Sequence, residues 1–566
     1  MLLFDPKTNE RAYADDKTRE LMDKVIKFFE DKGLESIKED FHERVWNHDF
    51  VEFAKQSQLF ATLMTPAGYG ADDSRWDTWR NSAFSEISGF YGLTYWYTFQ
   101  VSMLGLCPVW MGENEELKQK TAKLLQDGHV FAFGLSEKEH GADIYSSSME
   151  LTPTGDGKYL ANGRKYYIGN GNEAAITSMF AKMAGTGEYV FFATDSQHEN
   201  YECVKNTVVD ANYVAEIELN DYPITETDIM EVGSTAWDNM LNTINVCKFN
   251  LGWGSIGLCT HAFYESLHHA ANRNLYGMHV TDFPHVRQFF IDAYCRLVAM
   301  RVFADRAVDY MRSAGPEDRR YLLYNPMVKM KVTTQGEEVI RLLWEVIAAK
   351  GFESETFFEI AGHAIGMLPK LEGTAHVNMA LVVKFMKNFL FNPGEYPEVP
   401  KRNDTASDEF LMNQGPTRGL GKVQFHDYRI AYDSVDLPNV NVFKRQIDLF
   451  KKLLVQAGPD EKQAKDIDFL LGLGECFTLI AYGQLILENR PNFDELDDGL
   501  LDQIFDFMVR DMSRYALDIF NKSTSTEKQK KLALEIIQMP VFDEARFDTV
   551  WTDHVYTLKD IYPGPE

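Results

Sequence analysis

The stretch AAKGFESETFFEIAGHAIGMLPKLEGTAHVN, residues 348–378, places one carboxylate, Glu372, between Leu371 and Gly373. Two interpretations of this acid compete. An acid just before a helix complements the helix dipole, and VNMALVVKFMKNFLF follows with a helical pattern. A catalytic base needs a different setting, and the Gly- and Pro-flanked segment GMLPKLEG presents a carboxylate without helix constraints. The local sequence alone favours the helix-start interpretation.

Helical patterns surround this stretch. From about residue 250 to 392, FFIDAYCRLVAMRVFADRAVDYMRSAG and YNPMVKMKVTTQGEEVIRLLWEVIAAKG each predict a long amphipathic helix. The first 129 residues are also helical, beginning with TRELMDKVIKFFEDKG, whose apolar stripe is closed by Gly33. The aromatic run FYGLTYWYTF in this region is more typical of a buried core than of a ligand channel.

The segment from Val130 to about Val246 has β patterns instead. Asn162-Gly163 in KYLANGRKYYI is a strong hairpin signal, and Gly185-Thr186-Gly187 predicts a second turn. The alternating run NYVAEIELNDY predicts a further strand. We therefore expect a compact antiparallel β module between helical regions, with a ligand cleft where the parts meet.

A fourth part follows the Pro- and Asp-rich segment NPGEYPEVPKRNDTASDEF, which is typical of a linker. Beyond it, DDGLLDQIFDFMVRDMSRYALDIF predicts an amphipathic helix in a helical extension. The predicted fold class is α+β. Its parts are an N-terminal helical domain (1–129), a middle β domain (130–247), a C-terminal helical bundle of the core (248–395) and the linker with its extension (396–566).

Composition limits the partners. The 566 residues carry a formal net charge of -28, which disfavours nucleic acid and basic-patch binding to membranes. The six cysteines are scattered without metal-type spacing, so we predict a reduced, cytoplasmic protein and no metal site. The N-terminal segment lacks a signal-peptide pattern, and no run reaches the ~18 apolar residues of a membrane span.

Several ordered stretches carry a resemblance. They are GENEELKQK followed by DGHVFAFGLSEKEHGAD, then NGRKYYIGNG, then ANRNLYGMH, and finally AAKGF with LEGT at its usual distance. Over roughly residues 15–395 the chain resembles the acyl-CoA dehydrogenase family, which implies that family's fold and an FAD cofactor. Two family glycines are replaced by Ala348 and Ala349, and a tyrosine is replaced by Leu371.

The resemblance implies that the flavin lies along the β module. Tyr167 takes the aromatic place beside the isoalloxazine ring. Gly169 stands where relatives use a hydroxyl to contact flavin N5, a departure that bears on redox potential and oxygen reactivity. Apart from the resemblance, these segments are an ordinary strand–turn and a hairpin. The implied contacts in this part are Phe133, Leu135, Ser136, Gly141, Ala142, Tyr167, Ile168 and Gly169.

Further implied contacts lie in the helical parts. Arg273 matches an arginine that reaches the FAD pyrophosphate of a neighbouring subunit, and Gly351 and Thr374 complete the cofactor set. Lys248 stands where relatives carry an arginine near the CoA end of the substrate. Without the resemblance, Arg273 and Lys248 are solvated surface cations.

The resemblance implies α,β-dehydrogenation of an acyl-CoA to a trans-2-enoyl-CoA, as in fatty acid β-oxidation, with Glu372 as the base that removes the α proton. Flavin N5 would take the β hydrogen as hydride, and an electron-transfer flavoprotein would accept the electrons. Three alternatives stay open: an acyl-CoA oxidase that uses O2, a flavin monooxygenase, and a catalytically silent flavin- or CoA-binding protein. The extension favours a homodimer over the tetramer common among relatives.

Overall fold

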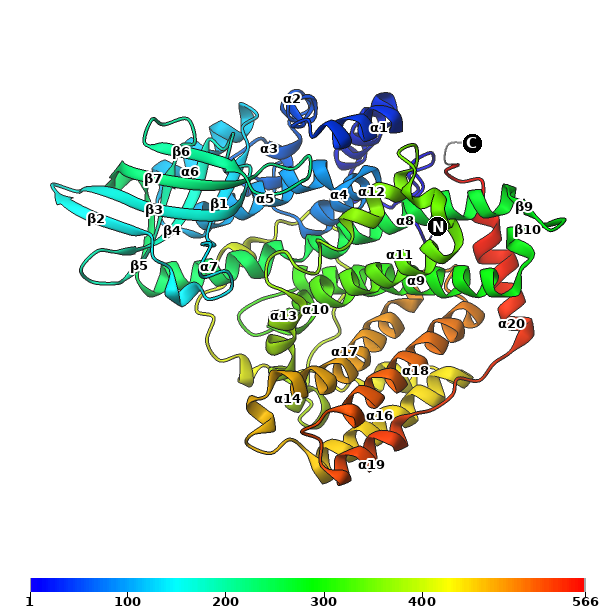
Figure 1. Ribbon diagram of the computed structural model, residues 1–566. Coiled ribbons are helices and arrows are strands. Elements are labelled where there is room, and N and C mark those ends of the chain that lie inside the picture. Colours follow the sequence, from blue (N-terminus) through cyan, green and yellow to red (C-terminus); the bar gives the residue numbers. More distant parts are fainter. Residues whose placement is uncertain (1, 564–566) are drawn as a thin grey trace.

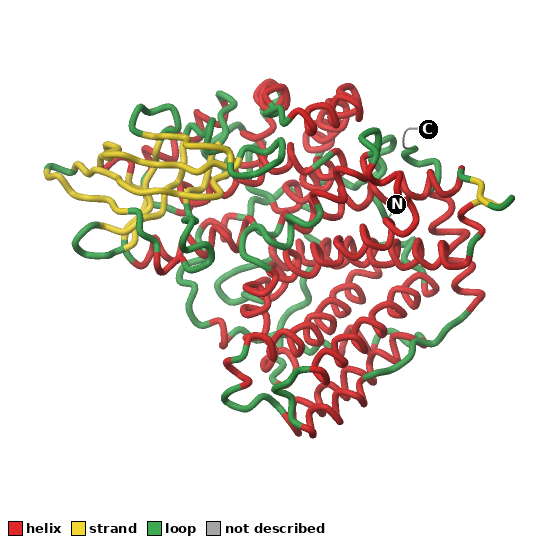
Figure 2. Tube along the Cα trace, in the orientation of Figure 1, coloured by secondary structure: helices red, strands yellow, loops and turns green. Residues whose placement is uncertain are grey.

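The computed structural model describes residues 2–563 and has a sheet domain at one end of a helical body (Figures 1 and 2). The N-terminal helices run along the upper edge of the view, from behind the sheet to above the helical body (Figure 1). Gly33, with φ 74°, kinks the first of them where the sequence predicts its stripe to close. These helices are α1 (Asp16–Glu43), α2 (His48–Gln56), α3 (Leu59–Met64), α4 (Thr78–Tyr91), α5 (Leu93–Met111) and α6 (Glu115–Gln126).

The sheet has eight strands in the order β6-β7-β3-β2-β4-β5-β8, with β1 paired to β4. It is mixed, because β1 and β2 both run parallel to β4, whereas the sequence predicts an antiparallel module. Local turn signals report only adjacent strands and carry no information on these crossover pairings. The strands are β1 (Phe131–Gly134), β2 (Glu150–Gly155), β3 (Lys158–Gly169), β4 (Ile176–Met183), β5 (Tyr189–Thr194), β6 (Tyr201–Asn206), β7 (Val214–Thr225) and β8 (Ile229–Val232).

The two predicted turns have opposite outcomes. Gly185 and Gly187, with φ of 84° and 73°, do join β4 to β5. The Asn162-Gly163 prediction is wrong, because β3 continues through this pair with a shift in register against β7. The hairpin instead turns at Asp156-Gly157, where φ is 52° and 68°, since both residues adopt the left-handed conformation of a tight two-residue turn.

The helical body follows the sheet. Residues 234–247, which the sequence analysis assigns to the β domain, form a helix, so the β signals end at β8. A π-helical segment, Val328–Val332, interrupts the rod between α10 and α11. The helices are α7 (Ser234–Cys247), α8 (Asn250–Asn272), α9 (Pro284–Arg312), α10 (Tyr321–Met327), α11 (Thr333–Ile347), α12 (Phe357–Ala364), α13 (Ala375–Val382) and α14 (Met386–Phe391).

Close contact between α4 and α8 fixes the centre of the body. A Cβ added at Gly257 would lie 2.0 Å from the Glu86 carbonyl oxygen, and one at Gly89 would lie 2.5 Å from the Gly254 carbonyl oxygen. Backbones this close leave room for glycine alone. The crossing therefore holds the N-terminal helices, including α5, firmly against the body.

The extension packs α17 and α18 against α9. The linker before it is anchored by Arg312, whose guanidinium bonds the Asp408 carboxylate at 3.0 Å and the Ala406 carbonyl at 2.6 Å. Within the described chain, one helix, 467–492, is long and apolar enough for a membrane span, but 83% of its apolar window is buried among other helices. The helices are α15 (Arg429–Asp433), α16 (Pro438–Ala457), α17 (Ile467–Asn489), α18 (Asp498–Asn521), α19 (Glu527–Ile536) and α20 (Glu544–Thr549).

Candidate active site

Glu372 lies in the loop between α12 and α13 and is not the cap of α13. Thr374 is the N-cap residue, and its hydroxyl accepts the Val377 N–H at 3.4 Å. Glu372 has a φ of 50° and Gly373 a φ of 85°, which turns the loop sharply before the helix. A non-glycine residue in this conformation is uncommon and is often found at functional sites. Glu372 therefore does not cap α13.

One oxygen of Glu372 is held and the other is free. Its Oε1 accepts a hydrogen bond from Gln100 Nε2 on α5 at 2.7 Å. The same amide group donates to the Cys247 carbonyl at 2.9 Å and accepts from Asn250 at 3.2 Å, so its orientation is fixed. Glu372 Oε2 is buried and has no hydrogen-bond partner among residues 2–563. This oxygen is available to take a proton from a ligand.

Two buried lysines lie near this carboxylate. Lys248 ends α7 and donates to Asn378 Oδ1 at 3.2 Å. Lys329, on the π-helical segment, donates to the carbonyls of Pro369, at 2.7 Å, and of Gly373. These two carbonyls flank Glu372, so Lys329 clamps the loop that carries it. Lys329 and Gln100 are not among the site residues predicted from the sequence, although each is a polar residue within an apolar helical run, which is a usable signal.

Burial controls the protonation of this cluster. It raises the pKa of Glu372 to about 7, against the opposing effects of the Gln100 hydrogen bond and the charges of Lys329 and Lys248. Burial also lowers the pKa of Lys329 to about 7 and that of Lys248 to about 8, although the charge of Glu372 opposes both shifts. A carboxyl group with this pKa can accept a proton near neutral pH and later release it.

The predicted flavin strand lies at the end of the sheet nearest α5. Phe133 and Leu135 are half-buried, and the Ser136 hydroxyl donates to the Tyr166 carbonyl at 2.6 Å. Beyond this bond, β3 bulges, and Tyr167 has a φ of 63° and an exposed fraction of 62%. Ile168, the next residue, is buried. Tyr167 thus has an unusual backbone conformation and exposes its aromatic ring to solvent. An exposed ring of this kind could stack against an aromatic ligand.

The loop with Gly141 and Ala142 is exposed and tethered at its base. Glu137 accepts from the backbone amide of Met149 at 3.1 Å and pairs with buried Lys165 at 2.8 Å. Gly141 lies outside the left-handed region, and an added Cβ would meet nothing within 4 Å. The fold therefore does not require glycine at 141, so this residue is not a turn glycine. The explanation that remains is close approach of a ligand to the protein backbone at this position.

Gly169 packs against side chains from α5. A Cβ at this position would lie 2.8 Å from the Tyr97 hydroxyl oxygen and 2.7 Å from Val101 Cγ1. The Tyr97 hydroxyl has no hydrogen-bond partner within residues 2–563, and burial and the nearby Glu372 charge raise its pKa. The Tyr97 hydroxyl therefore lies in the space that a side chain at 169 would occupy, and Tyr97 belongs to the buried core, as its sequence context predicts.

Arg273 and Gly351 lie far from Tyr167. Arg273 is exposed at the end of α8, beside the hairpin of β9 (Asn274–Leu275) and β10 (Met278–His279), at the end of the molecule opposite the sheet (Figure 1). Gly351 is buried, and a Cβ there would lie 2.9 Å from the ring of Phe358. One chain therefore places Arg273 at the end of the molecule opposite the sheet that carries Tyr167.

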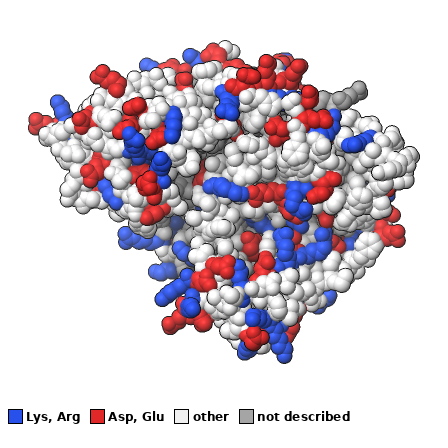
Figure 3. Space-filling view, viewed as in Figure 1, with Lys and Arg blue, Asp and Glu red and all other residues white. Residues whose placement is uncertain are grey.

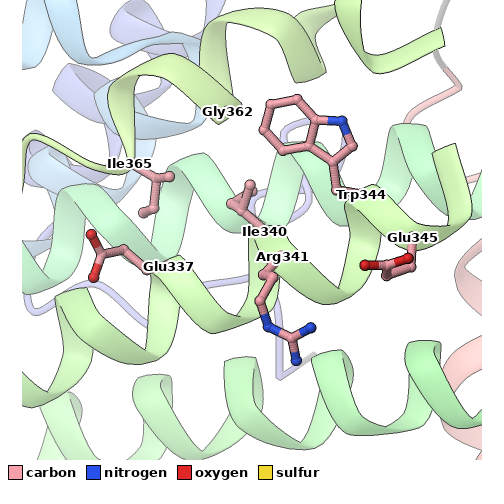
Figure 4. Close-up of a pocket in the computed structure, with 7 residues that line it drawn as sticks. All are labelled: Glu337, Ile340, Arg341, Trp344, Glu345, Gly362 and Ile365. Atoms are coloured by element: carbon pink, nitrogen blue, oxygen red, sulfur yellow. The ribbon is translucent and has the colours of Figure 1, made fainter. Parts of the chain in front are cut away.

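A separate depression of about 380 Å³ lies on the surface over α11 and α12 (Figure 4). Neither Glu372 nor any predicted flavin residue lines it, so it has no part in the cluster described above. Among the described residues, no group of His, Cys, Asp or Glu side chains is arranged to hold a metal ion. The depression is lined by Glu337, Ile340, Arg341, Trp344, Glu345, Gly362 and Ile365.

Comparisons with known proteins agree on one family. The family model described as acyl-CoA dehydrogenase, C-terminal domain, matches residues 237–387. A probable short/branched chain specific acyl-CoA dehydrogenase of Dictyostelium discoideum is 21% identical over 283 residues, covering 48% of this chain and 67% of that protein. The CarC subunit of the caffeyl-CoA reductase–Etf complex of Acetobacterium woodii is 24% identical, over 40% of this chain and 61% of the subunit.

Solved structures extend the similarity beyond the region that these sequences cover. The FAD complex of an acyl-CoA dehydrogenase from Bacillus anthracis aligns with a TM-score of 0.73 and 15% identity, over 99% of this chain and 97% of that one. Because the alignment spans nearly the whole chain, the helical extension is part of a fold that another protein shares.

Proposed function

The chain belongs to the acyl-CoA dehydrogenase family, and from this premise we propose that it oxidises an acyl-CoA thioester to a trans-2-enoyl-CoA with Glu372 as the base. The observation that carries the proposal is the buried Oε2 of Glu372, an unpartnered carboxylate oxygen whose pKa lies near neutrality. Most buried polar atoms in folded proteins have a hydrogen-bond partner, so an unpartnered carboxylate oxygen beside two buried lysines calls for an explanation, and proton transfer supplies one.

The residues present fit FAD. Tyr167 offers an exposed aromatic ring, the position of Gly141 is open, and the Tyr97 hydroxyl is a free donor between α5 and the sheet. Phe133, Leu135, Ser136, Ala142, Ile168 and Gly169 would hold the flavin from the same strand and loop, and Thr374 from the start of α13. FAD, when bound, accepts the β hydrogen together with its two electrons.

The protein's part in the reaction is to remove and hold the α proton. Glu372 Oε2 takes this proton, and Gln100 keeps the carboxylate oriented through Oε1. The backbone N–H of Glu372 donates to no group among residues 2–563, so it is free to bond the thioester carbonyl, where negative charge develops. Lys248 and Lys329 place positive charge nearby, which favours the ionised base.

We expect the reaction to depend on pH through Glu372. The base must be ionised to act. A plot of the logarithm of the rate of proton removal against pH should therefore rise with a slope of about one below pH 7 and level off above it. The same shift favours the protonated carboxyl in the folded chain. Its contribution to stability is thus present below the pH where an exposed Glu titrates, and is lost as the pH rises through about 7. Stopped-flow flavin reduction across pH 5–9 measures the rate profile, and a rate that falls with rising pH would contradict it.

The electrons leaving the flavin would pass to an electron-transfer flavoprotein. The support is the CarC relative, whose own name places it in a complex with an Etf. We also propose a homo-oligomer, with a dimer as the smallest form, because Arg273, next to β9, lies at the end of the molecule opposite the sheet that carries Tyr167. An oxidase would use O2 instead, and oxygen uptake during turnover distinguishes the two acceptors.

An anaerobic titration of the purified protein tests the reaction. We expect a flavin absorption band that bleaches when one member of a panel of acyl-CoA thioesters is added, with the enoyl-CoA identified by mass spectrometry. The panel should include short, long, branched and cyclic acyl chains, and free CoA is the matched control. A bound flavin that no thioester bleaches would overturn the proposal and favour a catalytically silent protein.

A further inference from the structure

A glycine-rich loop of the extension, residues 413–424 with the sequence NQGPTRGLGKVQ, lies against α7. Thr417 donates to Asp238 Oδ1 through its backbone amide at 3.0 Å and its hydroxyl at 2.7 Å. Asn242, one turn further along α7, donates to the Gly415 carbonyl at 3.0 Å. The loop is therefore fixed in place by side chains of the helix that ends beside Glu372.

The other side of the loop rests on the segment that follows α13. Asn388 of α14 donates to the Gly421 carbonyl at 2.9 Å. The short 3-10 helices Leu420–Lys422 and Val383–Phe385 also pack against each other. Both elements that hold the loop thus lead to the candidate active site, since Lys248 is the C-cap residue of α7 and Thr374 is the N-cap residue of α13.

Four exposed cations gather on these contacting elements. Arg418 and Lys422 belong to the loop, and Lys384 and Lys387 to the facing segment. None of the four forms an ion pair with another residue of 2–563, and the nearby carboxylate of Asp238 is engaged by Thr417. Along the lower left of the molecule, beneath the sheet domain, Lys and Arg side chains are visible with Asp and Glu among them (Figure 3). Unpaired like charges repel one another, and a bound anion would relieve this repulsion.

The backbone of the loop adds donors for an anion. Gly419 has a φ of 84°, and the amides of the four residues 418–421 donate to no group in the described chain. Consecutive free amides around a left-handed residue form a concavity that favours phosphate oxygens. A Cβ at Gly419 or Gly421 would meet nothing within 4 Å, so the space in front of the backbone is open.

The distance to Glu372 suits one ligand. Along the axis of α7, Asp238 lies about 15 Å and Asn242 about 9 Å before Lys248. Along α13 and the turn after it, Lys384 lies about 15 Å beyond Thr374. The pantetheine arm of CoA has the reach of roughly four extended residues, about 15 Å. A thioester at Glu372 would therefore bring the phosphates of its CoA to this loop.

We propose that Arg418 and Lys422, with Lys384 and Lys387 opposite, bind the phosphate groups of the substrate's adenosine 3′,5′-bisphosphate portion. The inference rests on the proposed function, because it takes the substrate to be a CoA thioester. It assigns a substrate-binding part to the extension, in addition to its packing against α9.

Adenosine 3′,5′-bisphosphate is a direct probe, because its binding needs no flavin chemistry. Isothermal titration should detect its binding to the wild type, and binding should weaken about tenfold or more in R418A/K422A and with added salt. The matched control is K528A/K531A, which removes two exposed, unpaired lysines from α19 of the same extension and should bind as the wild type does. No binding to the wild type, or an equal loss in both variants, would overturn the inference.

A second measurement separates this inference from the proposed reaction. In the wild type, kcat/KM for an acyl-CoA should exceed that for the same acyl-pantetheine, and R418A/K422A should reduce the ratio about tenfold or more. An unchanged ratio would exclude the loop as the phosphate site even if both thioesters bleach the flavin. Failure of both thioesters to bleach it, with the nucleotide still bound as expected, would overturn the proposed reaction alone.

Discussion

Replacing Glu372 by Gln should reduce the rate of flavin bleaching by acyl-CoA about a thousandfold or more while leaving the flavin bound. The amide has nearly the shape of the carboxylate and can keep a hydrogen bond with Gln100, but it cannot take the α proton. Loss of a positioned general base alone accounts for rate losses of about 10²–10⁴. Anaerobic stopped-flow with the thioester that bleaches the wild type measures the effect.

The matched control for this variant is E345Q, which neutralises an exposed acid on α11 and should react as the wild type does. A thioester should still bind to E372Q and perturb the flavin spectrum, because only proton removal is lost. If E372Q bleached at the wild-type rate, Glu372 would not be the base, and its free oxygen would need another explanation.

Removing Asp511 should destabilise the contact between the body and the extension by about 3–5 kcal/mol. Arg296 of α9 donates to both oxygens of Asp511 on α18, at 2.7 and 2.9 Å, and also to Gln335 at 2.7 Å. Both side chains of the pair are 4% exposed. Asp511→Ala would leave the Arg296 guanidinium buried without its counter-charge, which is costlier than losing an exposed pair.

The pH dependence of this pair follows from Asp511. Burial would raise the pKa of Asp511, but the charge and hydrogen bonds of Arg296 outweigh it and hold the pKa well below its usual range. The stabilisation is therefore present above the pKa of an unfolded aspartate and is lost only as the pH falls far below it. The effect should be complete throughout pH 5–8.

Urea denaturation and limited proteolysis of the linker, compared between wild type and D511A, measure the loss. The control is D498A, which removes the exposed partner of Arg490 and should cost under about 1 kcal/mol. The double variant R296M/D511L should recover part of the stability, because no charge is left buried. A cost for D511A as small as that for D498A would contradict the buried-pair argument.

The order of the parts was predictable from sequence, and the pairing of distant side chains was not. Helical periodicity predicted α9, α18 and the rod around α11, and the ordered motifs predicted the family, as the structure and comparisons confirm. The β signals failed where two turns competed, since Asp156-Gly157 forms the hairpin and Asn162-Gly163 only a bulge. Local sequence ranks turn residues, but strand pairing chooses between them.

The candidate site illustrates the same limit. Local sequence drew attention to Glu372 and offered two interpretations of it, a helix-start acid and a catalytic base. The residues that hold Glu372 and its loop come from α5 and the π-helical segment. Gln100 is 272 positions away from Glu372 along the chain, so no periodicity or spacing connects them. The roles assigned by resemblance to Phe133, Tyr167 and Arg273 stay predictions until a cofactor complex tests them.

The fit of Tyr97 against Gly169 makes these two positions interdependent during evolution and engineering. They share one volume, because a Cβ at 169 would collide with the Tyr97 hydroxyl at 2.8 Å. A serine at 169 is tolerable only after Tyr97 has become smaller, and a smaller residue at 97 leaves a void unless 169 gains a side chain. Each substitution is expected to be harmful alone, and the pair is acceptable only if Val101, whose Cγ1 would lie 2.7 Å from the same Cβ, also shifts. Single-site libraries would therefore reject both substitutions, although the two positions can change together.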